Sequence, residues 1–368
     1  MIPTGLYVHL PFCRVRCTYC AFAVSPDQTL ESRYVAALER EIAQRATGEP
    51  VDTIFFGGGT PSRTRPELLE RIAEALRTGF QLKPCLEFSI EANPEDIDTE
   101  SVDRWSKMGV NRLSIGIQSL SDVELRPLGR VHGAEGARRA MALVANSGMK
   151  FSVDLILGLP GQTAASSRQS LDEVIQSGAG HVSVYMLDLE EGTTLARQVE
   201  QKRTAVPEDE KIGEVYFAAI DQLERAGLHQ YEISNFAREG QECRHNLRYW
   251  RRLPYSGFGL SAHSFESGHR FANVRDLGAY IERMEAGASP VDFEETIGPG
   301  EDRRERILLG LRQVEGISSA EFLDLCGKEG TEWIRQGVLE GWVRQAGDRV
   351  ALTPAGFLLS NEYISRLF

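Results

Sequence analysis

Short apolar runs alternate with amphipathic helical segments along the first half of the chain, and this alternation restricts the possible folds most. Strands are predicted at residues 6–10, 53–56, 87–91, 112–117, 152–157 and 182–187. Helices are predicted between them at residues 34–45, 66–78, 100–108, 134–147 and 166–177. Connections of this length join parallel strands and place helices outside the sheet. We therefore predict an α/β protein built on a partial (β/α)6 barrel, which stays open because closure takes eight units.

The second half of the chain has a weaker pattern. Residues 207–226 and 275–285 are predicted helices, residues 230–271 a loop-rich region, and residues 294–300 a linker. Beyond them, residues 301–313, 318–325, 331–337 and 354–367 are predicted to be helical, and residues 342–345 and 349–352 to form a hairpin. We expect three domains: the partial barrel at residues 1–200, an extension of it at 201–295, and a small winged-helix-like α+β domain at 296–368.

Charge argues against a nucleic-acid partner. The chain carries 41 Lys and Arg against 53 Asp and Glu, a formal charge of −12, and has no long basic run. The winged-helix-like segment from Glu301 to Phe368 has nine basic and eleven acidic residues, or 9 − 11 = −2. Affinity for nucleic acid depends on cations that meet phosphates, so we interpret this segment as a packing or lid domain.

The cellular compartment is predicted from the start of the chain and from its cysteines. Residues 1–5 lack the basic and apolar regions of a signal peptide, and no uncharged apolar run approaches the ~20 residues that a membrane span needs. The six cysteines are too few for a disulfide framework in a chain of 368 residues. We expect a cytoplasmic protein whose clustered thiols serve as metal ligands.

Three of these cysteines stand together immediately after the first predicted strand. Cys13, Cys17 and Cys20 have the spacing C-x3-C-x2-C. Three thiolates on one tight loop can each hold one iron of a 4Fe–4S cluster and leave the fourth iron open for a substrate. Arg14 and Arg16 are expected to stabilise the thiolates. Zinc is less compatible, because a structural zinc site needs four closed ligands and this loop offers three.

Glycines and polar residues follow the other predicted strands. Gly58, Gly59 and Thr60 end the second strand, where glycines permit close backbone approach to a ligand or simply form a tight turn. Four further polar residues lie within or just beyond apolar strands: Glu91, Gln118, Arg130 and Asp154. Parallel strands carry their chemistry at their carboxyl ends, which favours a ligand site. The alternative is an internal ion pair, such as Asp154 with Arg130, that props the barrel open.

The cysteine spacing, with an aromatic residue before the third cysteine, resembles the signature of the radical S-adenosylmethionine (SAM) superfamily. The resemblance implies a radical SAM barrel in which SAM chelates the open iron of the 4Fe–4S cluster. Within that superfamily, the chain resembles the branch of oxygen-independent coproporphyrinogen III oxidase and its relatives. The resemblance implies SAM contacts at nine positions: Tyr7, Tyr19, Gly58, Gly59, Thr60, Glu91, Gln118, Arg130 and Asp154.

A second motif separates the members of this branch. The segment His245-Asn246-Leu247-Arg248-Tyr249-Trp250 matches the H-N-x-x-Y-W motif of the HemW heme chaperone family. His245 is a candidate axial ligand for heme, and flanking arginines could meet the propionates: Arg244, Arg248, Arg251 and Arg252. Cys243, His263 and His269 are rival ligands. The alternative is that Tyr249 and Trp250 are core aromatics and that the ring nitrogens of His245 cap a helix.

The resemblance implies a heme chaperone that binds heme, a 4Fe–4S cluster and SAM, and transfers heme to an acceptor hemoprotein, with a homodimer as a possible state. The main alternative is the oxidase, a radical SAM enzyme that decarboxylates coproporphyrinogen III. Oxidases of this branch carry an N-terminal extension and a further cysteine at the position of Phe22, which favours the chaperone. A radical SAM methylase is a further alternative. No residue is predicted to be catalytic, and enzymatic activity stays open at this point.

Overall fold

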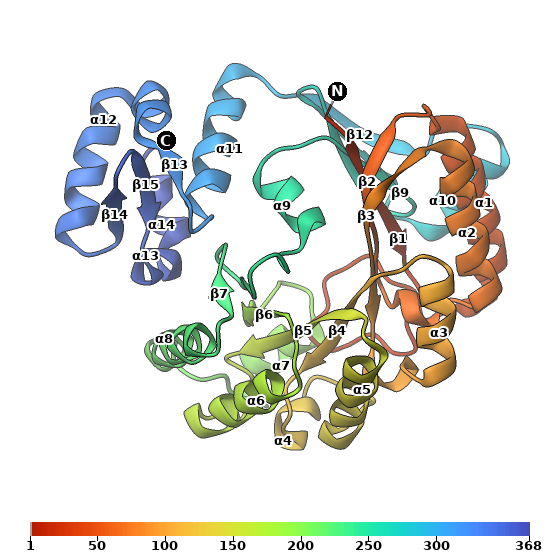
Figure 1. The fold of residues 1–368 in the computed structure, drawn as a ribbon, viewed down its shortest axis with the longest axis horizontal. Helices are drawn as coiled ribbons and strands as arrows, with labels where there is room; N and C mark the ends of the chain where they lie inside the picture. Colours follow the sequence, from red (N-terminus) through yellow and green to blue (C-terminus); the bar gives the residue numbers. More distant parts are fainter. Residues whose placement is uncertain (1) are drawn as a thin grey trace.

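The computed structural model describes residues 2–368, and one mixed sheet of twelve strands organises most of the chain (Figure 1). The strand order is β12-β11-β10-β9-β1-β2-β3-β4-β5-β6-β8-β7. The six central strands, β1 to β6, are parallel and follow the order of the sequence. These strands curve into an open barrel, as the alternation of strands and helices predicts, and the α/β fold class is confirmed.

The central strands coincide with the six predicted apolar runs. They span Thr4–Leu10 (β1), Pro50–Gly58 (β2), Gln81–Ala92 (β3), Arg112–Gln118 (β4), Lys150–Leu157 (β5) and His181–Met186 (β6). The main helices on their outer face are Glu31–Arg45 (α1), Pro66–Gly79 (α2), Thr99–Lys107 (α3), Ala134–Ser147 (α5) and Ala164–Gln176 (α6). Short helices Asp122–Leu125 (α4) and Thr194–Glu200 (α7) complete the connections. Apolar side chains between strands and helices form one continuous core.

Local sequence signals explain where several helices begin. Helices α3 and α6 start with capping boxes, in which Asp98 and Thr163 accept hydrogen bonds from the backbone N–H groups of Ser101 and Ser166. Helix α2 has Pro66 at its first position, where the missing N–H group removes no helical hydrogen bond. These boundaries fix the length of each connection and hence the strand ends that face the site.

Two predictions for the second half are wrong. The region 230–271 is not mainly loop: it contains strands His229–Gln230 (β7), Asn235–Ala237 (β8), Tyr255–Phe258 (β9), His263–Glu266 (β10) and His269–Asn273 (β11), and helix Arg244–Trp250 (α9). The predicted linker 294–300 is partly the edge strand Val291–Thr296 (β12), which pairs with β11. Its acidic residues suit an edge strand, where charge discourages further pairing, and Arg270 pairs with Glu295 across the two strands.

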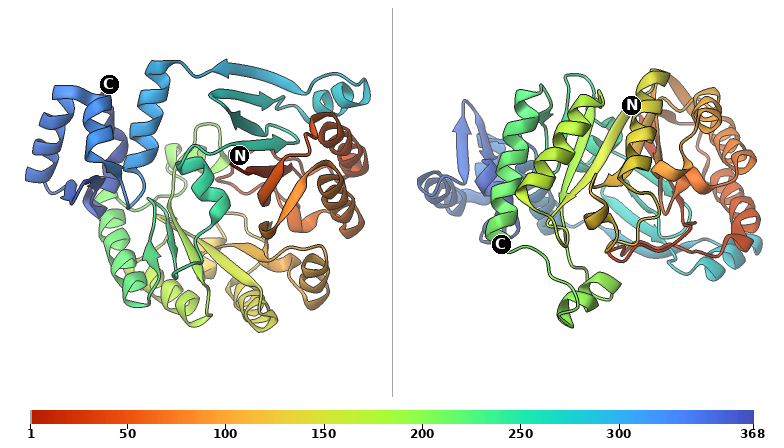
Figure 2. Two further views of the ribbon diagram at one scale, coloured as in Figure 1. Left: turned by 45° about the horizontal axis from the view of Figure 1, so that its top comes forward. Right: turned by 90° about the horizontal axis from the view of Figure 1, so that it is seen from below.

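The C-terminal segment forms a separate small unit with its own core (Figure 2). It comprises helix Pro299–Leu311 (α11), strand Ile317–Ser318 (β13), helix Ser319–Leu339 (α12), the hairpin Val343–Ala346 (β14) and Arg349–Leu352 (β15), and helices Pro354–Leu358 (α13) and Ser360–Ser365 (α14). Helices Asp209–Arg225 (α8) and Leu277–Glu285 (α10) belong to the larger part. In residues 2–368 no helix combines the length and apolar character needed to cross a membrane.

Candidate functional site

The cysteine loop leaves the end of β1 and is fastened to the barrel by its backbone. Its two arms pair through a bridge between Phe12 and Ser25 and through the Cys13 N–H group, which donates to the Ser25 carbonyl at 3.0 Å. The middle of the loop is held by Thr18, whose N–H donates to the Leu128 carbonyl at 3.1 Å. The conformation of the loop is therefore set by protein contacts at both ends and in the middle.

All three cysteines of this loop line one cavity of about 440 Å³ at the carboxyl ends of the strands. Eight of the residues predicted to contact SAM line the same cavity: Tyr19, Gly58, Gly59, Thr60, Glu91, Gln118, Arg130 and Asp154. These residues come from the cysteine loop and from the ends of β2 to β5 and their following loops. Tyr7 and His245 do not line this cavity. The strand-end rule thus places nearly all of the predicted residues around a single space.

The arrangement of thiols suits a cluster better than a single ion. Among residues 2–368, no set of three His, Cys, Asp or Glu side chains converges tightly enough for one metal ion. Each cysteine of a 4Fe–4S cluster binds a different iron, so its sulfur atoms stand farther apart than the ligands of one ion. Burial raises the pKa of Cys13 to about 11 and also raises the pKa of Cys20, so loading with iron must displace their protons.

The cation nearest to these sulfurs differs from the expectation for Arg14 and Arg16. Arg14 is exposed, and the Arg16 guanidinium donates to the Cys20 carbonyl at 3.3 Å rather than to a sulfur. Arg130 instead lies 3.5 Å from the Cys17 sulfur through Nη1. The charge of Arg16 still favours the Cys20 thiolate, as predicted, and Arg130, over 110 positions away in the sequence, adds a cation beside Cys17.

The turn Gly58-Gly59-Thr60 follows β2 in the chain and contacts the cysteine loop. Gly58 has φ +112°, and a Cβ atom there would lie 2.6 Å from the His9 ring, while one at Gly59 would lie 2.6 Å from the Pro11 carbonyl group. The Thr60 hydroxyl donates to the Cys13 sulfur at 3.3 Å. The tight packing of the glycines is therefore confirmed, and because they also border the cavity, contact with a ligand stays a prediction.

Two half-buried carboxylates, Glu91 and Asp154, lie on the inner face of the barrel and line the same cavity as the cysteines. Glu91 accepts a hydrogen bond from the Gly58 N–H group at 3.1 Å, and burial together with the nearby Asp154 raises the pKa of Glu91 to about 7. Asp154 accepts from the Ser114 hydroxyl at 3.1 Å, and burial raises its pKa also. Neither carboxylate has a cation within salt-bridge distance in the described residues. Carboxylates that are largely removed from water and lack a cation are suited to a cationic or hydrogen-bonding ligand.

Arg130 does not form the ion pair with Asp154 that was considered as a structural alternative. Its Nη2 donates to the Asn93 side chain at 2.7 Å and to the Gly116 carbonyl at 2.5 Å. Gln118, at the end of β4, has φ +69°, an unfavourable backbone conformation for a residue other than glycine. Such conformations persist where the surrounding structure enforces them, often at functional sites.

Several residues that line the cavity were missed from the sequence, and Asn93 and Tyr185 are examples. Asn93 stands two positions after Glu91 at the same strand end, and Tyr185 lies on β6. The position of Asn93 at a strand end was a usable signal, since the same rule selected Glu91. Tyr185 was concealed in an apolar strand, where a tyrosine is an ordinary packing residue.

A smaller polar chamber of about 190 Å³ continues from the main cavity into the barrel. Glu91, Asp154 and Tyr185 border both spaces. Tyr7 faces this chamber, and its hydroxyl lies 3.1 Å from the His9 Nδ1 atom. Tyr7 therefore lies next to the other predicted SAM residues, separated from the cysteines by Glu91.

His245, the predicted heme ligand, is part of the protein core. Its side chain is fully buried on α9, with Nδ1 at 3.0 Å from the Thr53 hydroxyl and Nε2 at 2.8 Å from the Tyr249 hydroxyl. The ring stacks on Phe55 with 5.3 Å between centroids. Burial lowers the pKa of His245 to about 3. Iron could reach Nε2 only after the bond to Tyr249 is broken, so the geometry favours a structural role. The ring nitrogens bond to side-chain hydroxyls, however, and do not cap a helix as the structural alternative proposes.

Most of the arginines proposed for the propionates are already paired. Arg244 and Arg248 both bind Asp52, and Arg252 binds Asp302 at 2.6 Å. Among the rival ligands, Cys243 is buried, with its sulfur 3.8 Å from Glu87, and His269 lies 3.2 Å from the Thr296 hydroxyl on the edge strand. His263 is exposed and borders a pocket beside the cysteine loop.

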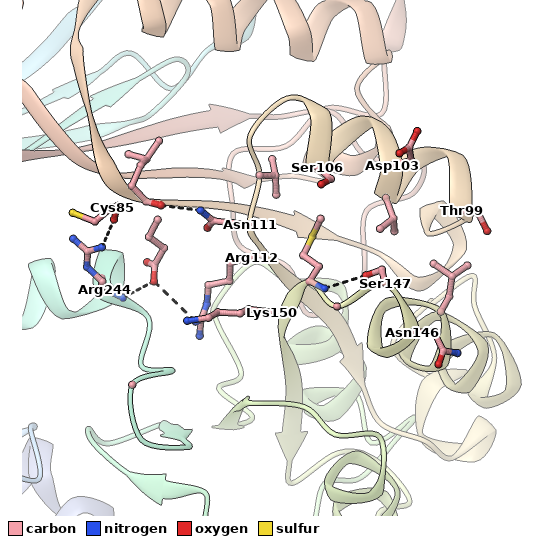
Figure 3. A pocket seen from close by; sticks show the side chains of 18 of the residues that line it. Cys85, Thr99, Asp103, Ser106, Asn111, Arg112, Asn146, Ser147, Lys150 and Arg244 are labelled. Carbon is pink, nitrogen blue, oxygen red and sulfur yellow. Dashed lines mark hydrogen bonds and ion pairs between the residues drawn. The ribbon is translucent and has the colours of Figure 1, made fainter.

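Figure 3 shows a wider cavity, of about 1070 Å³, at the opposite end of the parallel strands. It lies between α3, α5 and the segment that precedes α9. Two of its cations are engaged: Arg112 donates to the Gln241 carbonyl at 3.0 Å, and Arg244 to the Cys85 carbonyl at 2.7 Å. In parallel sheets the amino ends of the strands rarely hold the chemistry, so the cavity with the cysteines is the candidate site.

Comparisons with known proteins identify the relatives of the chain. A family model described as the radical SAM superfamily matches residues 7–174. The chain is 36% identical to the heme chaperone HemW of Synechocystis, with 100% of this chain and 97% of the relative covered. It is 35% identical to the heme chaperone HemW of Bacillus subtilis, with 97% of each covered.

A solved structure shares the fold. Coproporphyrinogen III oxidase (HemN) from Escherichia coli, described as a radical SAM enzyme, superposes with a TM-score of 0.85, covering 99% of this chain and 90% of that one. The identity is 23%, so this likeness concerns the fold alone. The full-length matches are more specific, and on their strength the chain belongs to the HemW family of the radical SAM superfamily.

Proposed function

We propose that this protein is a heme chaperone that holds a 4Fe–4S cluster and SAM and transfers heme to an acceptor hemoprotein. The observation that carries the proposal is the full-length similarity to heme chaperones named HemW. The cavity lined by Cys13, Cys17 and Cys20 supports it, because three thiols stand there beside eight of the residues expected to contact SAM. No residue is assigned a catalytic role.

Cluster and SAM have separate parts of the site in this proposal. The three cysteines would hold the cluster and leave one iron open, and the open iron would take the amino and carboxylate groups of SAM. When bound, the cluster supplies an electron to SAM, which is chemistry that the protein alone lacks. Glu91 and Asp154 would accept hydrogen bonds from SAM in place of the cation that they lack in the protein. Arg130 would hold the cysteine loop against β4.

The domain division fits the same scheme. Residues 1–200 would hold the cluster and SAM, residues 201–295 would add strands and α9 around the opening, and residues 296–368 would act as a packing domain. The C-terminal unit has a separate core, which supports its assignment as a domain. Residues 201–295 contribute strands to both edges of the barrel sheet, so they would fold with the barrel.

The test is an anaerobic heme titration of the cluster-reconstituted protein, followed through the Soret absorption band. Saturable binding near one heme per chain, with subsequent transfer to an apo-hemoprotein, is the expected result. A parallel assay follows carbon dioxide release from coproporphyrinogen III in the presence of SAM and a reductant. Decarboxylation without saturable heme binding would contradict the chaperone and favour the oxidase, whose fold this chain shares.

A further inference from the structure

A pocket of about 340 Å³ adjoins the cysteine loop and differs in chemistry from the surroundings of His245. Its lining includes Tyr7, Phe22, Tyr249, Tyr255, His263 and Arg275. A porphyrin needs an accessible ligand for its iron, flat apolar groups against its face and a cation for its propionates. The pocket contains a residue of each kind, whereas His245 is buried with both ring nitrogens occupied.

His263 has the freedom that an iron ligand requires. It lies on β10, so its backbone is held in the sheet while its side chain is exposed. Within residues 2–368, neither ring nitrogen of His263 has a hydrogen-bond partner. Partial burial and the neighbouring Arg270 and Arg275 lower its pKa, which keeps the imidazole neutral near pH 7. A neutral imidazole with an unoccupied nitrogen is the form that binds metals.

Arg275 and Phe22 supply the other two requirements. Arg275 is exposed and makes no ion pair in the described part of the chain, unlike Arg270, which binds both Glu295 and Glu305. Phe22 leaves 68% of its surface exposed, a high value for a large apolar side chain. An exposed phenyl ring beside a concave pocket is typical of a surface that a ligand covers.

The position of the pocket relates it to the cysteines. Phe22 stands two residues after Cys20 and borders both this pocket and the cysteine cavity. Tyr7, on β1, pairs with Gly257, and a Cβ atom at Gly257 would meet the His263 carbonyl oxygen at 2.1 Å. A ligand on His263 would therefore lie beside the cluster loop, within the same opening of the barrel, and an open pocket leaves one porphyrin edge accessible to an acceptor.

We propose that His263 is the axial ligand of the transported heme, with Arg275 binding a propionate and Phe22 covering the porphyrin face. The inference rests on the proposed function as a heme chaperone and assigns the heme to a pocket distinct from the core position of His245. The bond that forms is between a ring nitrogen of His263 and the heme iron, with no change in oxidation state.

The test compares His263→Ala with His269→Ala, an exposed histidine on the neighbouring strand β11. Hemin is titrated anaerobically into the full-length, cluster-reconstituted proteins. We expect His263→Ala to bind hemin at least tenfold more weakly and to lose the Soret maximum of the histidine-ligated form, while His269→Ala behaves as the unmodified protein. In His263→Gly, added imidazole should restore that spectrum. Arg275→Gln should weaken binding severalfold with the spectrum unchanged.

The possible outcomes are distinguishable. Iron content and the thermal midpoint of each variant establish that it is folded and holds its cluster. Unchanged affinity and spectrum in His263→Ala would overturn the assignment and leave the chaperone function standing. Absence of saturable hemin binding in the unmodified protein would overturn the chaperone function and this inference together.

Discussion

Two regions of the molecule match motifs of known families, and the two regions differ in how their side chains are exposed and paired. The cysteine loop and the strand ends around it surround a cavity, and within residues 2–368 neither Glu91 nor Asp154 has a cation at salt-bridge distance. The helix that carries His245 is packed against the barrel, with both ring nitrogens hydrogen-bonded. A motif residue that is buried and has all its hydrogen bonds made within the protein stabilises the fold. A motif residue that lines a cavity and lacks a charge partner is suited to bind a ligand. The bonding partners and the exposure of a side chain therefore distinguish a structural role from a ligand-binding role better than the motif does.

The largest expected effect tests the cysteine side of this comparison. Cys17→Ala removes one of three iron ligands and the sulfur that Arg130 approaches at 3.5 Å. After anaerobic reconstitution the variant should retain little or no cluster iron and sulfide, measured by chemical analysis and by the absorption near 400 nm. Cys85→Ala is the matched control, because Cys85 is exposed and lies at the other end of the strands. Full iron loading of Cys17→Ala would show that the loop is not the cluster site.

The second prediction tests the His245 side. His245→Ala removes a fully buried ring, leaves the Tyr249 hydroxyl without a partner, and leaves the Thr53 hydroxyl with only the bond that it accepts from Arg248 at 2.9 Å. We expect a loss of about 2–4 kcal/mol in the free energy of unfolding, from the cavity and the unsatisfied group. Urea denaturation measures this change, and the folded fraction should still bind hemin. Unchanged stability together with abolished hemin binding would show that His245 binds heme and does not stabilise the fold.

The third prediction concerns Glu91 and pH. Burial raises its pKa from 4.5 to about 7, so the native protein retains this proton at pH values where the unfolded chain has released it. The contribution to stability is complete below about pH 4.5 and is lost as the pH rises through about 7. Glu91→Gln is neutral throughout, so without SAM it should be more stable than the unmodified protein at pH 8 by about 1–3 kcal/mol.

Urea denaturation at several pH values measures the Glu91 effect. The difference between the variant and the unmodified protein should shrink towards zero near pH 4.5. Parallel pH profiles for the two proteins would mean that the Glu91 carboxylate already has a charge partner in solution, and the contrast between unpaired and paired groups would then fail.

The smallest expected effect is that of one hydroxyl. Tyr249→Phe removes the group that lies 2.8 Å from the His245 Nε2 atom and should cost about 1 kcal/mol of stability. Tyr255→Phe is the control, because its hydroxyl has no hydrogen bond within residues 2–368, and it should change stability by less than about 0.5 kcal/mol. Equal effects of the two substitutions would show that the His245–Tyr249 bond contributes nothing.

The sequence was sufficient for the six central strands and for the three cysteines and eight further residues of the cavity. Strands buried on both faces consist of apolar runs, and the strand-end rule then groups Glu91, Gln118 and Asp154. Strands β9 to β12 were missed because their short, polar segments resemble loops until a neighbouring strand supplies hydrogen bonds. The charged residues of β12 resembled a linker for the same reason.

The hydrogen-bond partners of individual side chains could not be predicted from the sequence. Arg130 bonds to Asn93 and to the Gly116 carbonyl rather than to Asp154, and this depends on side-chain orientations that no sequence pattern encodes. The burial of His245 depends on how a short helix packs on β2, which is a long-range contact. Sequence reasoning therefore selected residue types and strand ends correctly but could not distinguish an occupied ring nitrogen from an available one.

The backbone fastening of the cysteine loop bears on how the protein would survive damage by oxygen. The bridge between Phe12 and Ser25 and the bond from Thr18 to Leu128 involve no metal, so these contacts do not themselves require iron. A cluster destroyed by oxidation would leave a folded apoprotein with its thiols in place. Repair would then require delivery of a new cluster rather than synthesis of a new chain, and the supply of clusters would set the pool of active protein.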